Sequence, residues 1–510
     1  MPEKIVIQAQ EFQSETFQDV IRDWFKQAPW FLVSLVIHAI LGLIIANIDW
    51  QTLRSDQNKI IQSQYENEEM EPLPEEEMEE EEKEMEEIEE IIEDPTVTDE
   101  EIFEEEVFED ENPIDSPFDG KNVNDIIGVG GGAGGKFGGK YRKRAKKGGG
   151  QATQRAVEAG LDWLKRHQDP EGFWDADGFE MQCTLNRCNG PGNALNDVGL
   201  TGLALLAFLG AGNTPTEGPY KKVVKKGVKY LTDIQDPEDG CLCPKEGQHY
   251  MYNHAIGTLA LTEAFGLSRY APVKKFAKRA LDYIHKTKNP GKAWRYNDGD
   301  PDPFNQNDVS VTGWMIMCLA SAKDFELPFE KADIVDSLAY IDEMTDPTTG
   351  RTGYKQKGSY SSRELGDQET WPAEYGESMT AVAMLCRVFC GIILEDVESQ
   401  DEMLQKGGQL LLAKRPQWKE DEDGKFYQDY YYWYYGSYAM FQVGGDEWEK
   451  WKKDMVNAVV ENQRQDGCEK GSWDPMFDPW GDSGGRVYST ALCTLCLEVF
   501  YRYDSILGSR

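Results

Sequence analysis

The strongest constraint on this 510-residue chain is a repeat: six helix-like segments open with a similar group of polar and small residues. The segments start at Asp197, His254, Asp308, Gly376, Tyr434 and Arg486. Each leads into a run rich in Ala, Leu, Met and aromatic residues, and the starts recur at roughly 50–70 residues, a spacing that suits one pair of helices per unit. The sequence therefore predicts one helical unit repeated around a closed ring.

A second set of helical patterns lies between these segments. Its members span residues 154–167, 221–234, 273–286, 329–344, 402–413 and 448–463. Six inner and six outer helices thus alternate along the chain, and no convincing strand interrupts them. We predict an all-α fold over residues 151–510, a double-layered α/α toroid of about six helical hairpins, preceded by one transmembrane helix and a disordered acidic linker.

Tight connections that carry Gln, Gly and Trp follow several outer helices. They are Gln168-Asp-Pro-Glu-Gly172-Phe-Trp174, Gln235-Asp-Pro-Glu-Asp-Gly240 and Gln465-Asp-Gly467-Cys-Glu-Lys-Gly-Ser-Trp473. Gly ends a helix in a left-handed turn, and Gln and Trp can bridge to the next element. The Gln-x-x-x-Gly-x-Trp spacing of Gln168, Gly172 and Trp174 resembles the QW repeats of the terpenoid cyclase and protein prenyltransferase superfamily. This resemblance extends over about residues 151–510 and implies a squalene-hopene-cyclase-like α/α toroid.

An apolar segment near the N-terminus, residues 29–48, is about as long as a membrane's hydrocarbon core requires. A long polar stretch precedes it and no small-residue cleavage site follows, so we expect an uncleaved transmembrane helix in the bilayer. Residues 1–28 are expected to form an amphipathic segment on the membrane surface. Basic residues slightly favour a cytoplasmic N-terminus, which predicts a single-pass protein of a bacterial inner membrane with the toroid in the periplasm.

One face of this apolar segment is polar, because Ser34 and His38 are four residues apart. Polar side chains at membrane depth are expected to face protein. With the preceding Pro29-Trp30, the pair resembles the anchor of the TonB family of energy transducers, which implies contact with the subunits of a proton-driven motor. The alternative is that a single His is simply tolerated near the middle of such a helix.

Residues 49–150 have the composition of a linker. Between Glu66 and Asp119 there are 29 acidic residues and one base, Lys83, which accounts for most of the net charge of −39. Such a sequence repels itself and cannot pack a core. The Gly-rich stretch from Gly128 lacks the Gly-Lys-Ser/Thr ending of a phosphate loop, so we interpret it as a flexible hinge. Nucleic acid is not an expected partner of this acidic chain.

The first residue of each inner helix start is the candidate functional position. Asn196, Asn253 and Asn307 precede three of these starts and are predicted N-caps. Asp just inside a helix start is also favoured by the helix dipole, so a purely structural role is the alternative for two of the positions. The functional interpretation is a polar rim around a central cavity that binds an unknown ligand, formed by Asp197, His254, Asp308, Glu377, Tyr434 and Arg486.

Cyclase chemistry makes a specific demand on this rim. In the squalene-hopene-type cyclases that the chain resembles, the middle Asp of an Asp-x-Asp-Asp motif protonates an alkene. Here the aligned residues are Asn305-Gln306-Asn307-Asp308, so an amide stands in the position of the acid. The candidate catalytic residues are therefore Asp308, Asp197, His254 and Glu377. The three carboxylates among them are also candidates for the hydrolysis or lysis of glycans.

No cofactor is predicted, with a divalent metal ion as the alternative. In protein prenyltransferases, which the chain resembles, zinc is held by an Asp-x-Cys pair and a His one repeat later. The spacing of Asp239 and Cys241 matches that pair, and Cys243, His249 and His254 follow within the same repeat. Among the other thiols, Cys183 and Cys188 could form a disulfide, whereas Cys386/Cys390 and Cys493/Cys496 are expected to be buried thiols on helices.

These features together predict a membrane-anchored extracytoplasmic binding protein. The central cavity and polar rim of the toroid would hold its ligand, and the anchor would link it to a TonB-type motor. The alternatives are an isoprenoid cyclase or transferase and, second, a glycan hydrolase or lyase. The incomplete acid motif favours binding over catalysis.

Overall fold

The computed structural model describes the C-terminal part of the chain, residues 150–184, 186–247, 249–290, 292–296, 307–354, 356–359, 376–396, 398–420, 426–476 and 478–502. The expected amphipathic segment, the transmembrane helix with Ser34 and His38, and the linker up to residue 149 lie outside the described residues. Among the described helices, none is both long enough and apolar enough to cross a membrane.

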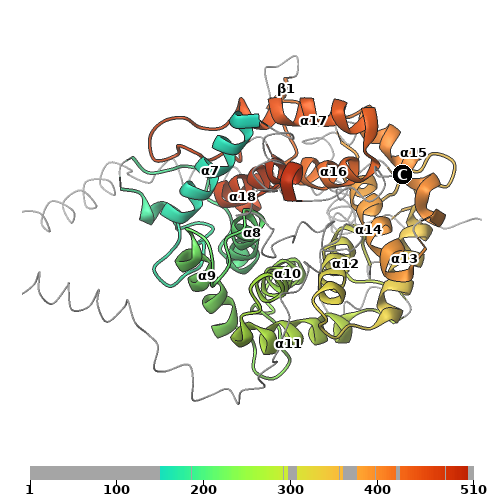
Figure 1. Ribbon diagram of the computed structural model, residues 1–510, viewed down its shortest axis with the longest axis horizontal. Helices are drawn as coiled ribbons and strands as arrows, with labels where there is room; N and C mark the ends of the chain where they lie inside the picture. Colours follow the sequence, from blue (N-terminus) through green and yellow to red (C-terminus); the bar gives the residue numbers. More distant parts are fainter. Residues whose placement is uncertain are drawn as a thin grey trace, which may run out of the picture. The chain divides into compact units, whose positions relative to one another are not determined.

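In the described residues, twelve α-helices alternate between an inner and an outer layer of a ring (Figure 1). The inner helices are α8 (Asp197–Gly210), α10 (Tyr250–Ser268), α12 (Val309–Asp324), α14 (Ser378–Leu394), α16 (Tyr430–Val443) and α18 (Gly481–Arg502). The outer helices are α7 (Gly150–Arg166), α9 (Lys221–Asp233), α11 (Ala271–Thr287), α13 (Lys331–Met344), α15 (Asp401–Leu412) and α17 (Gly445–Val460).

The inner helices close on themselves. Each packs against the next along the chain, and α18 packs back against α8, while α17 reaches α7 in the outer layer. The predicted α/α toroid is therefore confirmed. The expectation of no strand needs one correction, because the described residues include a two-residue antiparallel pair, β1 (Lys419–Glu420) with β2 (Phe426–Tyr427), on the outside of the ring.

The two layers differ in how they bury apolar residues. In α8 every residue from Val198 to Gly210 is buried, because an inner helix is covered by the outer layer, its two neighbours and the ring interior. In α9 the buried positions Val223, Val224, Gly227, Val228 and Leu231 follow one helical face. This amphipathic pattern explains why the outer helices could be bounded from the sequence to within a few residues.

The Gln of the tight connections ties each repeat to the next outer helix. The Gln168 amide donates to the carbonyl of Gly172 at 2.7 Å and to that of Val223 in α9 at 3.0 Å. Gln235 makes the same two bonds, to Gly240 and to Phe276 in α11. In the last repeat Gln463 takes this role, donating to Gly471 and to Ala156 of α7, so the assignment of Gln465 was wrong by two residues.

The Trp of the same connections joins the outer and inner layers. The indole N–H of Trp174 donates to the Leu164 carbonyl of α7 at 2.7 Å, and the backbone N–H of Trp174 donates to the Thr201 hydroxyl of α8 at 3.0 Å. Trp294 and Trp473 repeat this arrangement with Thr312 and Thr490. A buried Thr near the start of each of these three inner helices therefore accepts a hydrogen bond from the connecting turn.

The predicted Asn caps are not confirmed. Asn196 is at the N-cap position of α8 without capping it, Asn253 lies inside α10, and the N-cap of α12 is Asp308 rather than Asn307. Two of the Asn side chains instead link neighbouring repeats: Asn253 donates to the Leu195 carbonyl at 2.8 Å and Asn196 to the Ser483 carbonyl at 2.9 Å. The prediction failed because the helices start at different distances from the Asn in different repeats.

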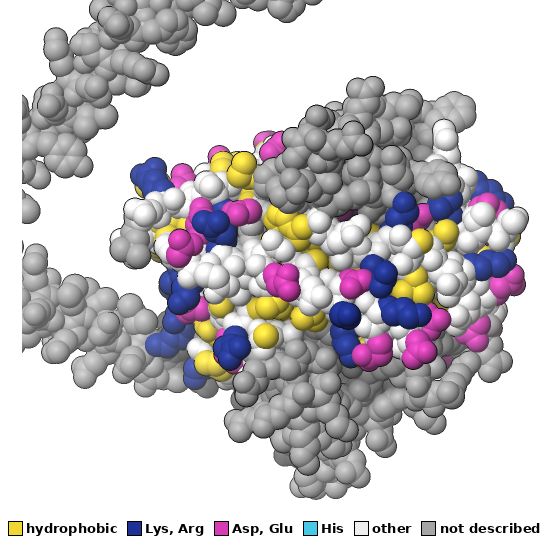
Figure 2. Space-filling view, turned by 90° about the horizontal axis from the view of Figure 1, so that it is seen from above, with side chains coloured by type: hydrophobic (Ala, Val, Ile, Leu, Met, Phe, Trp, Pro, Cys, Tyr) yellow, Lys and Arg dark blue, Asp and Glu magenta, His cyan; other side chains and the backbone are white. Residues whose placement is uncertain are grey.

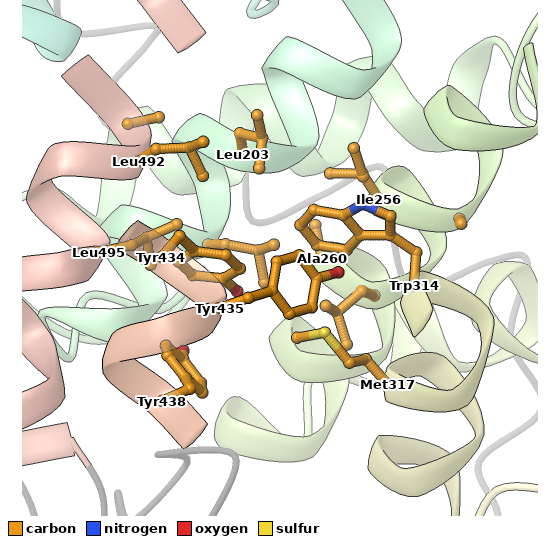
Figure 3. Packing of buried hydrophobic residues seen from close by; sticks show 14 of the residues in the cluster. Leu203, Ile256, Ala260, Trp314, Met317, Tyr434, Tyr435, Tyr438, Leu492 and Leu495 are labelled. Atoms are coloured by element: carbon orange, nitrogen blue, oxygen red, sulfur yellow. The ribbon is translucent and has the colours of Figure 1, made fainter. Parts of the chain in front are cut away.

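Aromatic side chains fill part of the ring interior (Figure 3). Trp314 of α12 stacks on Tyr434 of α16 with ring centroids 5.9 Å apart and meets Tyr435 edge-on at 5.5 Å. Leu203 of α8 and Leu492 of α18 lie above Tyr434 and Tyr435 in this view. The aromatic run of α16 is thus mainly core packing between inner helices, the more common role of such a run.

Candidate functional site

The candidate site is a cavity at the end of the ring where the inner helices begin. Its volume is about 180 Å³, and its walls come from α8, α10, α12, α16, α18 and the segments just before them. The lining residues are Asn196, Gly199, Leu200, Leu203, His249, Tyr252, Asn253, Ile256, Tyr296, Ser310, Trp314, Tyr431, Trp480, Ser483, Gly484, Tyr488 and Leu492. Five of the six inner helices therefore contribute to one concave surface.

The cavity wall is mainly apolar and aromatic. Ser310 and Tyr431 form a hydrogen-bonded hydroxyl pair in it, with their oxygens 2.6 Å apart. Burial raises the pKa of Tyr252, Tyr431 and Tyr488 well above that of an exposed phenol, so these side chains remain neutral. None of the described lining residues is Asp, Glu, Lys or Arg. The wall suits an apolar ligand with few polar groups.

The outer surface has a different character. Basic and acidic side chains alternate over the described part of the face in Figure 2, with hydrophobic side chains between them. Neither sign of charge forms a continuous patch on that part of the face. Such a mixed surface suits solubility more than the electrostatic capture of a polyanion.

Two of the predicted rim residues are held by main-chain groups of the connecting turns. Asp197 accepts a bond from the Ala176 N–H at 2.8 Å, and burial raises its pKa to about 7. His254 is fully buried, where Nδ1 accepts from the Leu242 N–H at 3.2 Å and Nε2 lies 3.1 Å from the Ala280 carbonyl. Because both ring nitrogens are bonded to main-chain groups, the imidazole of His254 is a structural bridge between α10 and α11.

Asp308 is fully buried at the start of α12. Its Oδ1 accepts from the Val311 N–H at 2.8 Å as a helix cap, and its Oδ2 lies 3.0 Å from Nη1 of Arg295. Burial raises the pKa of Asp308, while the neighbouring guanidinium opposes that shift. The carboxylate thus joins the turn before α12 to the helix itself.

The remaining rim residues are also engaged within the protein. Glu377 forms a two-pronged ion pair with Arg351, with contacts of 2.8 and 3.0 Å. Tyr434 packs on Trp314, as described above. Arg486 is fully buried and donates to the Asn189 carbonyl at 2.8 Å and the Ser472 hydroxyl at 2.9 Å. None of the six predicted rim residues is among the described residues that line the cavity.

The six predicted rim residues differ widely in charge, and so do the groups that they contact. Five of the six side chains meet different groups: a backbone N–H in the first two repeats, a guanidinium from Arg295 or Arg351 in the next two, and the carboxylates of Asp474 and Glu469 with carbonyl and hydroxyl oxygens around Arg486. In each case the side chain complements the group that it contacts. These contacts give five of the six side chains a structural role between the inner helices and the neighbouring turns.

Sequence reasoning missed the residues that line the cavity. On α18 they are Tyr488 and Leu492, four residues apart, with Ser483 and Gly484 just before the kink at Gly485, and on α10 and α8 they follow three- and four-residue steps. Apart from that kink, these are ordinary helical faces. They gave no signal because the inner helices are apolar on all sides, so periodicity does not show which face points to the ring interior.

Among the described residues, the predicted metal ligands Asp239, Cys241, Cys243 and His254 are not a group whose ligand atoms all lie within 4.8 Å of one another. Asp239 is paired with Lys245 at 2.7 Å, and both nitrogens of His254 are bonded to the main chain. Cys241 and Cys243 have sulfurs 3.9 Å apart, and all ten cysteines are free thiols, so Cys183 and Cys188 do not form the disulfide considered above. The thiols Cys386, Cys390, Cys493 and Cys496 are buried, as expected.

Comparison with known proteins gives a likeness of fold. No family model matches the chain, and no curated protein matches it. An inactive variant of the α-1,6-mannanase GH76A of Salegentibacter sp. HEL1_6, in complex with α-1,6-mannotriose, is similar with a TM-score of 0.47 and 11% identity, covering 69% of this chain and 99% of that one. A variant of the type II terpene cyclase MstE from Scytonema is similar with a TM-score of 0.41 and 11% identity, covering 71% of this chain and 98% of that one. The assignment of an α/α toroid rests on the arrangement of the chain's own helices.

Proposed function

We propose that the toroid binds an apolar, isoprenoid-like ligand in the cavity between α8, α10, α12, α16 and α18. The observation that carries this proposal is the chemistry of the wall: mainly aromatic and aliphatic side chains, with no Asp, Glu, Lys or Arg among the described lining residues. The polar exceptions are the bonded Ser310–Tyr431 pair and Asn196, His249, Asn253 and Ser483. Burying a flexible hydrocarbon against such a wall is favourable by about 25 cal/mol per Å² of apolar surface. The proposed protein is thus still a binding protein, as the sequence predicts, and its ligand is taken from the isoprenoid alternative.

Isoprenoid cyclisation is a second candidate for the same cavity. Aromatic rings such as those of Trp314, Tyr431 and Tyr488 line it, and the faces of such rings stabilise positive charge. Asp308, the candidate acid, lies two residues before Ser310 of the wall but is held by Arg295. We do not propose glycan hydrolysis, because that reaction needs two carboxyl groups facing one bond and the described wall provides none.

The predicted anchor gives this proposal a setting. If residues 29–48 cross a membrane, the linker of residues 49–150 would let the toroid reach isoprenoid lipids at the membrane surface or beyond it. Coupling of Ser34 and His38 to a proton-driven motor, and a periplasmic location, remain part of this proposal. The coupling is tested by co-purification of motor subunits with wild type and with Ser34→Ala/His38→Ala.

Equilibrium binding of radiolabelled farnesol to the full-length chain tests the proposal, with α-1,6-mannotriose as the second probe. We expect saturable binding of farnesol and none of the trisaccharide. Leu203→Trp places an indole into a cavity of about 180 Å³ and should weaken farnesol binding at least tenfold. Val335→Trp is the control, because Val335 is 49% exposed on α13.

Equal farnesol affinity in wild type and Leu203→Trp would overturn the assignment of the cavity. Saturable binding of the trisaccharide instead would favour the glycan alternative. For the second candidate, squalene is incubated with the protein and the extract is searched for cyclic isomers. A product that disappears in Asp308→Asn while that variant remains folded would support cyclisation. If the folded wild type forms no product from any linear isoprenoid, ligand binding is the function that remains.

A further inference from the structure

Four potential metal ligands converge away from the cavity, at the place where the ring closes. They are His167, directly after α7, Cys183 and Cys188 in the following connection, and Cys468 between α17 and α18. His167 Nε2 lies 3.5 Å from the sulfur of each of the three cysteines. All four ligand atoms are within 4.8 Å of one another.

This arrangement has the dimensions of a tetrahedral zinc site. With Zn–S of about 2.3 Å and Zn–N of about 2.05 Å, the N···S edge of a tetrahedron is about 3.6 Å. The three N···S distances of 3.5 Å agree with that value. Three Cys and one His are also a ligand set of structural zinc sites, which are closed by four protein ligands. We infer that His167, Cys183, Cys188 and Cys468 bind one Zn²⁺ ion.

The surroundings of His167 orient it as a ligand. Its Nδ1 lies 2.8 Å from the Trp163 carbonyl, which places the proton on Nδ1 and leaves the lone pair of Nε2 directed at the three sulfurs. The ring stacks on Trp163 with centroids 4.1 Å apart and meets Phe179 edge-on. A His ligand whose other nitrogen donates to a backbone carbonyl is typical of metal sites.

The sulfur ligands have matching support. The Cys188 N–H donates to the Cys183 sulfur at 3.3 Å, a bond that stabilises negative charge on a thiolate. Arg166 donates to the carbonyl of Cys468 at 3.2 Å and to that of Lys470 at 2.8 Å, which holds the distant ligand in place. Cys188, Cys468 and His167 are buried, so the metal ion would be shielded from solvent by protein.

The position of the site indicates its role. His167 and Cys468 are 301 residues apart in sequence, and they belong to the first and last repeats of the ring. Gln463 with Ala156 and Arg486 with Asn189 cross the same junction. Figure 1 shows this junction, where α7 of the outer layer lies beside α17 and α18. A metal ion here would cross-link the two ends of the toroid, a structural role separate from ligand binding in the cavity.

Metal content of the full-length chain, purified without chelators, tests this inference. We expect about one zinc per chain by inductively coupled plasma mass spectrometry, and its loss in Cys468→Ser and in His167→Ala. The control is Cys243→Ser, which changes a buried thiol in the other Cys/His group and should keep the zinc. Loss of zinc in Cys243→Ser with retention in Cys468→Ser would overturn the assignment.

A second measurement uses the wild-type chain alone and so does not depend on the folding of variants. Exchange with Co²⁺ should produce the visible ligand-field bands of a tetrahedral thiolate site, and added Zn²⁺ should abolish them. Protein that neither contains zinc nor takes up Zn²⁺ or Co²⁺ after reduction would refute the inference. So would a Cys183–Cys188 disulfide found by mass spectrometry in protein kept under reducing conditions.

Discussion

The buried pair of Arg295 and Asp308 allows a quantitative test of how the rim residues act. The side chain of Asp308 is 0% exposed and that of Arg295 is 3% exposed, with Nη1 and Oδ2 3.0 Å apart. Removing one member of such a pair leaves a buried charge without compensation and costs about 3–5 kcal/mol. Replacing both by neutral groups of similar size avoids most of that penalty. The two substitutions should therefore be strongly non-additive.

We expect Arg295→Met to lower the free energy of unfolding by about 3–5 kcal/mol near pH 7, and Asp308→Asn by a similar amount. The amide introduced by Asp308→Asn keeps a side-chain oxygen for the Val311 N–H, so the helix cap is preserved. The double variant should lose only about 1–3 kcal/mol, which gives a coupling energy of about 2–4 kcal/mol. Urea unfolding of the full-length chain, monitored by tryptophan fluorescence, measures the free energy of unfolding of the wild type, the two single variants and the double variant.

The pH dependence of Arg295→Met adds an internal check. Burial raises the pKa of Asp308, and Arg295→Met removes the guanidinium that opposes this rise. A raised folded-state pKa means that stability is retained at low pH and lost as pH rises, so the deficit of Arg295→Met should be smaller at pH 5 than at pH 8. Additive single effects, with coupling below about 0.5 kcal/mol, or a deficit independent of pH would refute the reasoning.

Three further predictions concern other parts of the ring. Burial raises the pKa of Asp197 to about 7, so the stability gained from its neutral form is present below about pH 4 and lost as pH rises to 7. Asp197→Asn should therefore be more stable than wild type at pH 8 by about 2 kcal/mol, after allowance for partial exposure. The same pH dependence of unfolding in wild type and Asp197→Asn would contradict this. A Cβ at Gly471, where φ is +96°, would overlap the Ala159 carbonyl oxygen, whereas one at Gly467 meets no atom within 4 Å. Gly471→Ala should lose more than about 3 kcal/mol and Gly467→Ala about 1 kcal/mol, and equal losses in urea unfolding would show that the close approach is not limiting. A zinc chelator should lower the Tm by about 5 °C or more, with recovery on addition of Zn²⁺ but not Mg²⁺; a Tm unaffected by the chelator would count against a structural metal ion.

Local patterns were sufficient to predict the architecture. The outer helices are amphipathic, so their sequence records which side is buried, and Gly172 and Gly240 record turns with positive φ. The Gln and Trp of the connections make backbone bonds that recur from repeat to repeat, which is why a spacing pattern identified them. The fold could therefore be predicted from the sequence, apart from the β pair and the caps.

The site residues were harder to predict for two physical reasons. Inner helices are apolar all round, so the sequence does not show that Tyr252, Ser310, Trp314 and Tyr431 face one cavity. The polar residues at the helix starts suggested a ligand-binding rim, and the structure shows that five of the six bond to neighbouring turns. Polar residues at helix starts have local hydrogen-bonding needs that a repeat pattern cannot distinguish from ligand binding.

By itself, the sequence determined the repeated unit, the helix periods and the all-α class of residues 151–510, because these depend on interactions between residues near one another in the chain. Only the tertiary structure decided which side chains meet. His167 and Cys468 are separated by 301 residues, and their convergence requires that the ring close with the first repeat against the last. Contacts of that kind depend on the summed geometry of all six repeats, which no local pattern contains.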